Sequence, residues 1–81
     1  MAKKVGSVLG IDIGSETIKV CEVKSQGKTP VVTAIGIAPT PEGAVDGSGI
    51  YNPEAVAASL KALIAQSGAT AKDAVVSIAG D

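Results

Sequence analysis

The sequence contains no tryptophan, phenylalanine or histidine, and only one tyrosine and one cysteine. Without large aromatic side chains, the core must be built from Ala, Val, Ile, Leu and Gly, which suits thin layers of strand and helix packed closely together. The single cysteine, Cys21, excludes a disulfide within the chain, and the lack of histidine excludes Cys/His zinc sites and Ser-His-Asp catalysis. Cys21 is expected to act as a small hydrophobic side chain in a reducing compartment.

The charge of the chain is nearly balanced. Seven Lys and Arg against eight Asp and Glu give a net charge of −1, with no basic face or aromatic ladder that would suit nucleic acid. The apolar run near the N-terminus is interrupted by Gly6, Gly10 and Asp12, so it is too broken for a signal peptide and too short to cross a bilayer. We therefore expect a cytoplasmic protein that binds no nucleic acid and has no membrane span of its own.

The hydrophobic pattern predicts an α/β chain with the element order β-β-β-α-β. Runs rich in β-branched residues over 8–13, 17–24 and 31–38, separated by turns, predict an antiparallel meander over residues 8–38. A loop rich in Pro and Gly follows over residues 39–52, and it holds either a short strand near Ile50 and Tyr51 or a contact surface. A helix over residues 53–67 and a last strand over 74–79 complete the chain.

The helix has clear signals at both ends. Asn52 is a good N-cap, Pro53 fits the first helical position, and Gly68 suits the position after the last turn. The spacing i, i+4, i+7 and i+8 predicts a core-facing stripe of Val56, Leu60, Leu63 and Ile64.

The connection from the third strand through the helix to the last strand is a crossover, which should be right-handed. The last strand then lies parallel beside the first, so a mixed sheet of order 3-2-1-4 with one packed helix is predicted. One helix covers only one face of such a sheet, and the other face stays apolar and bare. We therefore expect the chain to be part of a longer protein.

The most informative segment spans residues 12–19. Asp12 ends an apolar strand, a Gly-Ser turn follows at once, and the next strand carries Thr17 and Lys19. A phosphate with its Mg²⁺ needs backbone N–H groups, hydroxyls and a cation for the anion, and a carboxylate for the hydrated metal. The alternative is an ordinary hairpin with both charged side chains solvated. Against it, Asp12 interrupts an apolar strand, and Gly14 lies where a ligand needs close backbone approach.

Two other sequence patterns give weaker evidence for a functional site. The tripeptide over residues 27–29 resembles the end of a P-loop, but the earlier Gly that a P-loop needs is Glu22, and Pro30 starts a strand instead of a helix. No predicted element brings two further carboxylates together. We expect four of them to be surface groups: Glu22, Glu42, Asp46 and Glu54.

The motif Asp-x-Gly-x-x-x-x-Lys over residues 12–19 resembles the first phosphate-binding hairpin of actin-like proteins. Three stretches, residues 11–20, 39–44 and 52–56, are similar in order and content to the PilM family of type IV pilus assembly proteins, relatives of the cell-division protein FtsA. The resemblance implies that residues 1–81 are the N-terminal part of an actin-like nucleotide-binding domain. The fold class is then the first half of an actin-like, RNase H-like subdomain.

The resemblance also implies ATP and Mg²⁺ as ligands. Asp12 would hold Mg²⁺ through water, and Lys19 would neutralise phosphate charge. Backbone N–H groups of the turn, with the Ser15 and Thr17 hydroxyls, would face the β- and γ-phosphates, whereas the Glu16 side chain departs from the small polar residue often found there. The implied binding residues are Asp12, Gly14, Ser15, Glu16, Thr17 and Lys19. The family's second hairpin and adenosine pocket would follow residue 81, so this chain alone is expected to bind ATP weakly.

In function, the resemblance implies a cytoplasmic ATP-binding scaffold at the inner face of the bacterial inner membrane. It would clasp the cytoplasmic N-terminal peptide of PilN and so join the inner-membrane pilus assembly complex. No catalytic residue is expected in this chain, and ATP hydrolysis stays an open question. Two alternatives remain: an FtsA-like or other actin-like ATPase or kinase, and a free-standing binding module that self-associates through the bare sheet face.

Overall fold

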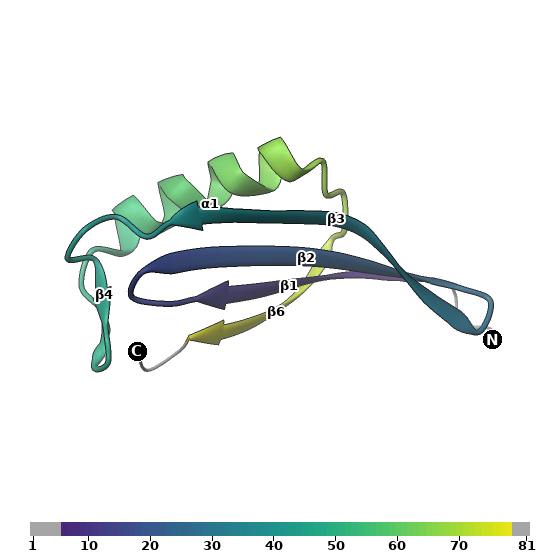
Figure 1. Ribbon diagram of the computed structural model, residues 1–81, viewed down its shortest axis with the longest axis horizontal. Helices are drawn as coiled ribbons and strands as arrows, with labels where there is room; N and C mark the ends of the chain where they lie inside the picture. The colour runs from purple at the N-terminus through teal and green to yellow at the C-terminus, as the bar shows by residue number, and fades with distance from the viewer. Residues whose placement is uncertain (1–5, 79–81) are drawn as a thin grey trace.

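The computed structural model describes residues 6–78, which form a mixed four-stranded sheet with a helix along one side (Figure 1). The elements in chain order are β1 (Ser7–Ile13), β2 (Thr17–Gln26), β3 (Thr29–Pro39), β4 (Val45–Asp46), β5 (Gly49–Ile50), α1 (Pro53–Ser67) and β6 (Asp73–Ile78). The sheet order is β3-β2-β1-β6, with β1 antiparallel to β2 and parallel to β6. The predicted order 3-2-1-4 is confirmed, because β6 is the strand that follows the helix.

Most element bounds lie close to those predicted. The helix begins and ends where expected. β1 is one residue longer than predicted, β2 is two residues longer and β3 is three residues longer. The last strand is Asp73–Ile78 instead of residues 74–79, and Ala79 lies outside the described residues. The segment over residues 39–52 contains a small hairpin in which Val45 pairs with Ile50, so a short strand does lie there.

Both helix ends use the residues that the sequence indicates. The Asn52 side chain accepts a hydrogen bond of 3.1 Å from the Ala55 N–H, which satisfies one of the free donors of the first turn. Gly68 has φ 81°, the left-handed conformation that ends many helices and that glycine adopts without strain. No helix in residues 6–78 combines the length and the apolar character needed to cross a bilayer.

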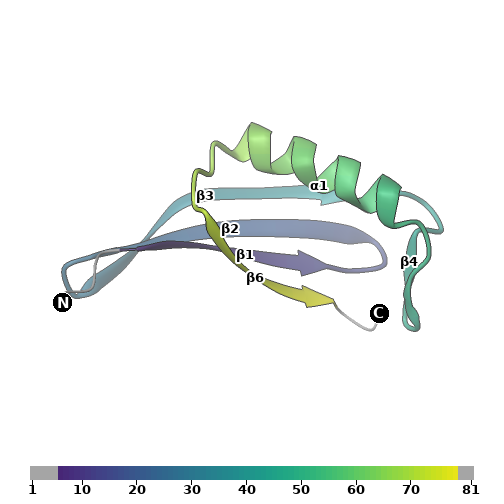
Figure 2. The ribbon, with the colours of Figure 1, turned by 180° about the vertical axis from the view of Figure 1, so that it is seen from behind.

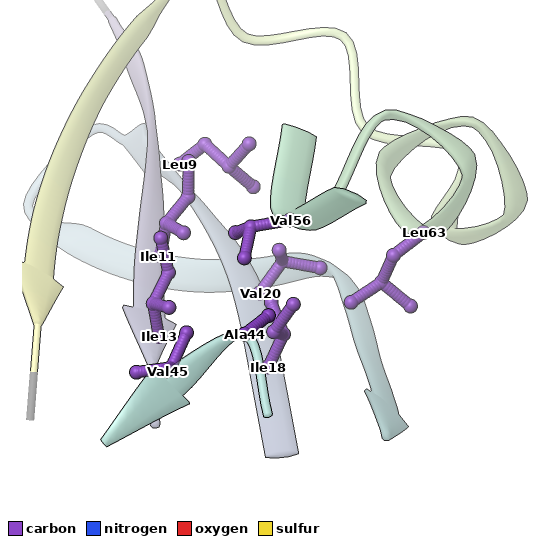
Figure 3. Close-up of a cluster of buried hydrophobic side chains, with 9 residues drawn as sticks. All are labelled: Leu9, Ile11, Ile13, Ile18, Val20, Ala44, Val45, Val56 and Leu63. Carbon is purple, nitrogen blue, oxygen red and sulfur yellow. The ribbon is translucent and has the colours of Figure 1, made fainter. Parts of the chain in front are cut away.

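The core lies between the sheet and α1 (Figure 3). Alternate residues of β1 and β2 point to this face, and Ile18 and Val20 are almost completely buried. Val56 and Leu63 reach down from the helix. At the end of the sheet, Ala44 and the first residue of β4, Val45, close the core.

Gly36 in β3 determines how closely the helix approaches the sheet. A Cβ at this position would lie 2.9 Å from Leu63 Cδ1 and 3.4 Å from Val20 Cγ2. The missing side chain therefore leaves the space into which Leu63 packs.

The opposite face of the sheet is bare in the described structure, as expected. Figure 1 shows α1 along one side of the sheet, and Figure 2 shows the same arrangement from behind. Large apolar side chains of the sheet remain exposed, with Ile35 at 72%, Val75 at 65% and Ile37 at 63%. Cys21 is half-buried on the same face as a free thiol.

One carboxylate was wrongly predicted to be a surface group. Glu22 is only 2% exposed, and its carboxylate accepts the Thr33 hydroxyl at 2.7 Å and the N–H groups of Thr70 at 2.8 Å and Ala71 at 2.6 Å. The Thr33 hydroxyl most strongly, then these N–H groups and the charge of Lys24, lower the pKa of Glu22 against the desolvation that raises it. The other three carboxylates of that set are exposed, as predicted.

A β-bulge brings Thr33 to Glu22. The pairing of β2 with β3 passes from Glu22↔Ala34 to Val23↔Val32, which leaves Thr33 without a partner in the ladder. An extra residue of this kind bends a strand and redirects its side chain. The bulge thus supplies the hydroxyl that a buried carboxylate needs.

Candidate functional site

Asp12 and Lys19 are direct cross-strand partners in the antiparallel pair of β1 and β2. Residues directly opposite each other in such a pair point to the same face, with Cβ atoms about 4.5–5.5 Å apart. Because Ile11 and Ile13 are buried toward the helix, Asp12 and Lys19 lie on the bare face, where Asp12 is half-buried and Lys19 is exposed. The two charged side chains therefore start from opposite positions on the same face, close to the turn.

Ser77 of β6 joins this pair from a distant part of the chain. The parallel pairing of β1 with β6 places Ser77 beside Asp12, so Lys19, Asp12 and Ser77 form one row across three strands. The three residues line a shallow hollow of about 300 Å³ on the bare face. The sequence gives no sign of this contact, because only the register of β6 brings the hydroxyl to Asp12.

The turn from Gly14 to Thr17 closes the β1–β2 hairpin. The Gly14 N–H donates a hydrogen bond of 2.9 Å to the Thr17 carbonyl. A Cβ on Gly14 would lie 3.2 Å from that same carbonyl oxygen, so a side chain here would crowd the closest approach of the two strands. The N–H groups of Ser15 and Glu16 make no hydrogen bond to any other residue in the described range, and so they remain available as donors.

Thr40, the first residue after β3, makes two hydrogen bonds to the turn. Its N–H donates to the Glu16 carbonyl at 2.9 Å, and its hydroxyl donates to the Gly14 carbonyl at 2.7 Å. Thr40 is 8% exposed. Sequence reasoning missed this residue, although its place between Pro39 and Pro41 is a recognisable signal of a constrained backbone.

A family model described as type IV pilus assembly protein PilM matches residues 10–81. This chain belongs to the PilM family. The match covers the turn and every element from β2 to β6, so the resemblance inferred from three short stretches of sequence is confirmed. The chain has a role in type IV pilus assembly, and the match favours that role over the FtsA-like alternative.

In this member of the PilM family, the predicted site residues lie close together in space. All six lie within the β1–β2 hairpin, and the side chains of Glu16 and Lys19 are exposed. The arrangement offers N–H donors and hydroxyls at the turn, an ammonium group beside it and one carboxylate. Residues 6–78 contain no group of three or more His, Cys, Asp or Glu that could hold a metal ion alone. Asp12 fits Mg²⁺, which commonly takes one or two carboxylates and completes its shell with water and phosphate oxygens.

Proposed function

We propose that this chain supplies the first phosphate-binding hairpin of an ATP site in an actin-like, cytoplasmic scaffold of the type IV pilus machinery. The observation that carries the proposal is the Asp12–Lys19 pair on one face of the sheet, directly beside a turn with free N–H donors. An anion-binding concavity of successive N–H groups, with a cation and a carboxylate at its rim, suits a phosphate that arrives with its metal.

Each residue has a distinct role in this proposal. The N–H groups of Ser15, Glu16 and Thr17 face the β- and γ-phosphates, and the hydroxyls of Ser15 and Thr17 add donors. Lys19 offsets phosphate charge, and Asp12 binds Mg²⁺ through water. This role is one of ATP binding, and hydrolysis lies outside it.

Nuclear magnetic resonance on the ¹⁵N-labelled chain tests the phosphate site even where binding is weak. We expect Mg-ATP to shift the amide signals of Ser15, Glu16 and Thr17, whereas Mg-AMP, which lacks the β- and γ-phosphates, leaves them in place. Asp12→Asn should remove the dependence on Mg²⁺, because it removes the carboxylate charge that attracts the hydrated metal. The matched control is Asp46→Asn, at an exposed carboxylate in the β4–β5 hairpin.

Two outcomes contradict the proposal. One is a set of ATP-induced shifts that avoids the turn. The other is an identical response to Mg²⁺ in the wild type and in Asp12→Asn.

We also propose that the cytoplasmic N-terminal peptide of PilN is the partner, which would hold the protein at the inner face of the inner membrane. Membership of the PilM family supports this partner. Calorimetric titration with that peptide, and with a scrambled peptide as control, should give saturable binding for the native peptide alone. Equal heats for the two peptides would remove PilN from the proposal.

A second candidate function is self-association through the bare sheet face, which the exposure of Ile35, Ile37 and Val75 favours. Light scattering after size exclusion should then give a mass that rises with protein concentration. Ile35→Lys should abolish the rise, and Tyr51→Lys, at an exposed side chain outside the sheet, should not. A monomer at every concentration excludes this function.

A further inference from the structure

Thr40 makes two hydrogen bonds to the turn, and they reach two different peptide groups. The 2.7 Å bond from its hydroxyl reaches the Gly14 carbonyl, and the 2.9 Å bond from its N–H reaches the Glu16 carbonyl. Thr40 itself is nearly buried. One residue outside the hairpin thus sets the direction of both carbonyls.

The geometry of the peptide group carries this constraint to the donors. In a trans peptide the C=O and the following N–H lie in one plane and point in opposite directions. Because the Gly14 carbonyl points to Thr40, the Ser15 N–H points away from it. The Glu16 carbonyl fixes the Thr17 N–H in the same way.

The position of Thr40 is itself constrained. Pro39 and Pro41 on either side restrict the backbone. The Ala44 N–H donates a hydrogen bond of 3.0 Å to the Pro41 carbonyl, and Ala44 is buried in the core. The segment after β3 is therefore anchored to the sheet on both sides of Thr40.

We propose that Thr40 is a positioning residue that orients the Ser15 N–H group for phosphate, and that its second bond fixes the neighbouring Thr17 peptide group of the turn. The inference rests on the proposed function for its ligand, since phosphate is the anion that the turn would receive. Donors fixed in advance lose less freedom when the anion binds, and so they bind it more tightly. Thr40 contacts no phosphate in this scheme and acts only through the two peptide groups.

The test compares variants of the ¹⁵N-labelled chain. Thr40→Val keeps the shape but removes the hydroxyl, Thr40→Ala removes it with less steric demand, and Thr40→Ser restores it. The matched control is Thr33→Val, which removes another hydroxyl hydrogen bond of 2.7 Å, at the bulge. Amide signals of Ile11 and Val20 report whether each variant remains folded.

In the free protein, we expect Thr40→Val and Thr40→Ala to shift the Ser15 and Thr17 amide signals and to lower their order parameters. With Mg-ATP they should bind about five- to tenfold more weakly, the loss expected for one hydrogen bond. Thr40→Ser should restore both readouts. Thr33→Val should lower thermal stability while the two amide signals stay in place.

Unchanged Ser15 and Thr17 amides in the folded Thr40→Val and Thr40→Ala variants would overturn the role of Thr40. The same holds for equal changes in Thr33→Val. A wild-type chain that shows no response to Mg-ATP would refute the proposed phosphate ligand, and with it the phosphate part of this inference. The amide signals of the free protein test the orientation of the turn independently of phosphate binding.

Discussion

The carboxylate of Glu22 in β2 accepts a hydrogen bond of 2.8 Å from the N–H of Thr70, which lies 48 residues further along the chain. The same oxygen accepts the Ala71 N–H, and the other accepts the Thr33 hydroxyl. A buried carboxylate is tolerated only with such partners. Glu22 therefore ties the connection between α1 and β6 to the middle of the sheet.

The first prediction concerns pH. The pKa of Glu22 lies below its ordinary value of 4.5, because the hydrogen bonds from Thr33, Thr70 and Ala71 favour the ionised form. A lowered folded-state pKa adds stability that is fully present above the unfolded value and is lost as pH falls through the folded value. We expect Glu22→Gln to lower the Tm at neutral pH and to remove this part of the decline in stability below pH 4.5.

Urea unfolding followed by circular dichroism at a series of pH values measures this effect. Glu42→Gln, at an exposed carboxylate, is the matched control and should keep the wild-type profile. Parallel pH profiles for the wild type and Glu22→Gln would contradict the prediction.

The second prediction concerns the contact between helix and sheet. Gly36→Ala places a Cβ 2.9 Å from Leu63 Cδ1, so the helix side chain must shift. We expect a loss of about 1–3 kcal/mol in the free energy of unfolding, as for other overpacked cores. Gly10→Ala is the control in the same sheet, since its Cβ would lie at an ordinary 3.6 Å from the Cys21 carbonyl and should leave stability unchanged or slightly higher. Equal losses for the two variants would count against the role of Leu63.

The third prediction concerns the start of α1. Asn52→Ala removes the acceptor for the Ala55 N–H and should lower the free energy of unfolding by about 1 kcal/mol. Asn52→Asp keeps a side-chain oxygen at the cap and should retain most of the stability. Thermal unfolding of the three proteins side by side gives the comparison, and an unaffected Asn52→Ala would show that the cap contributes nothing.

Local signals made the helix and the sheet order predictable. Asn52, Pro53 and Gly68 act on the backbone within a few residues, so the helix bounds could be found without knowledge of its surroundings. The crossover through the helix then favoured a place for the last strand beside β1 and parallel to it. The β1–β2 hairpin was likewise predictable, because its turn residues lie between two apolar runs that are close together in the sequence.

Contacts between distant segments could not be predicted. Glu22 looked like a surface group because two of its partners are backbone N–H groups in the connection between α1 and β6, and backbone groups carry no sequence signature. Thr33 depends on a bulge, whose position is fixed only by the pairing of β2 with β3. Ser77 and Thr40 reach the candidate site through strand register and through a loop, respectively.

The bond from Thr40 to Gly14 also has a consequence for the order of folding. It spans 26 residues, whereas the β1–β2 hairpin closes over a few. Short loops close at a smaller loss of chain entropy than long ones, so the hairpin can form before β3 has paired. The turn from Gly14 to Thr17 then reaches its final shape only after β3 has paired with β2. Any separation of β3 from β2 frees the turn again.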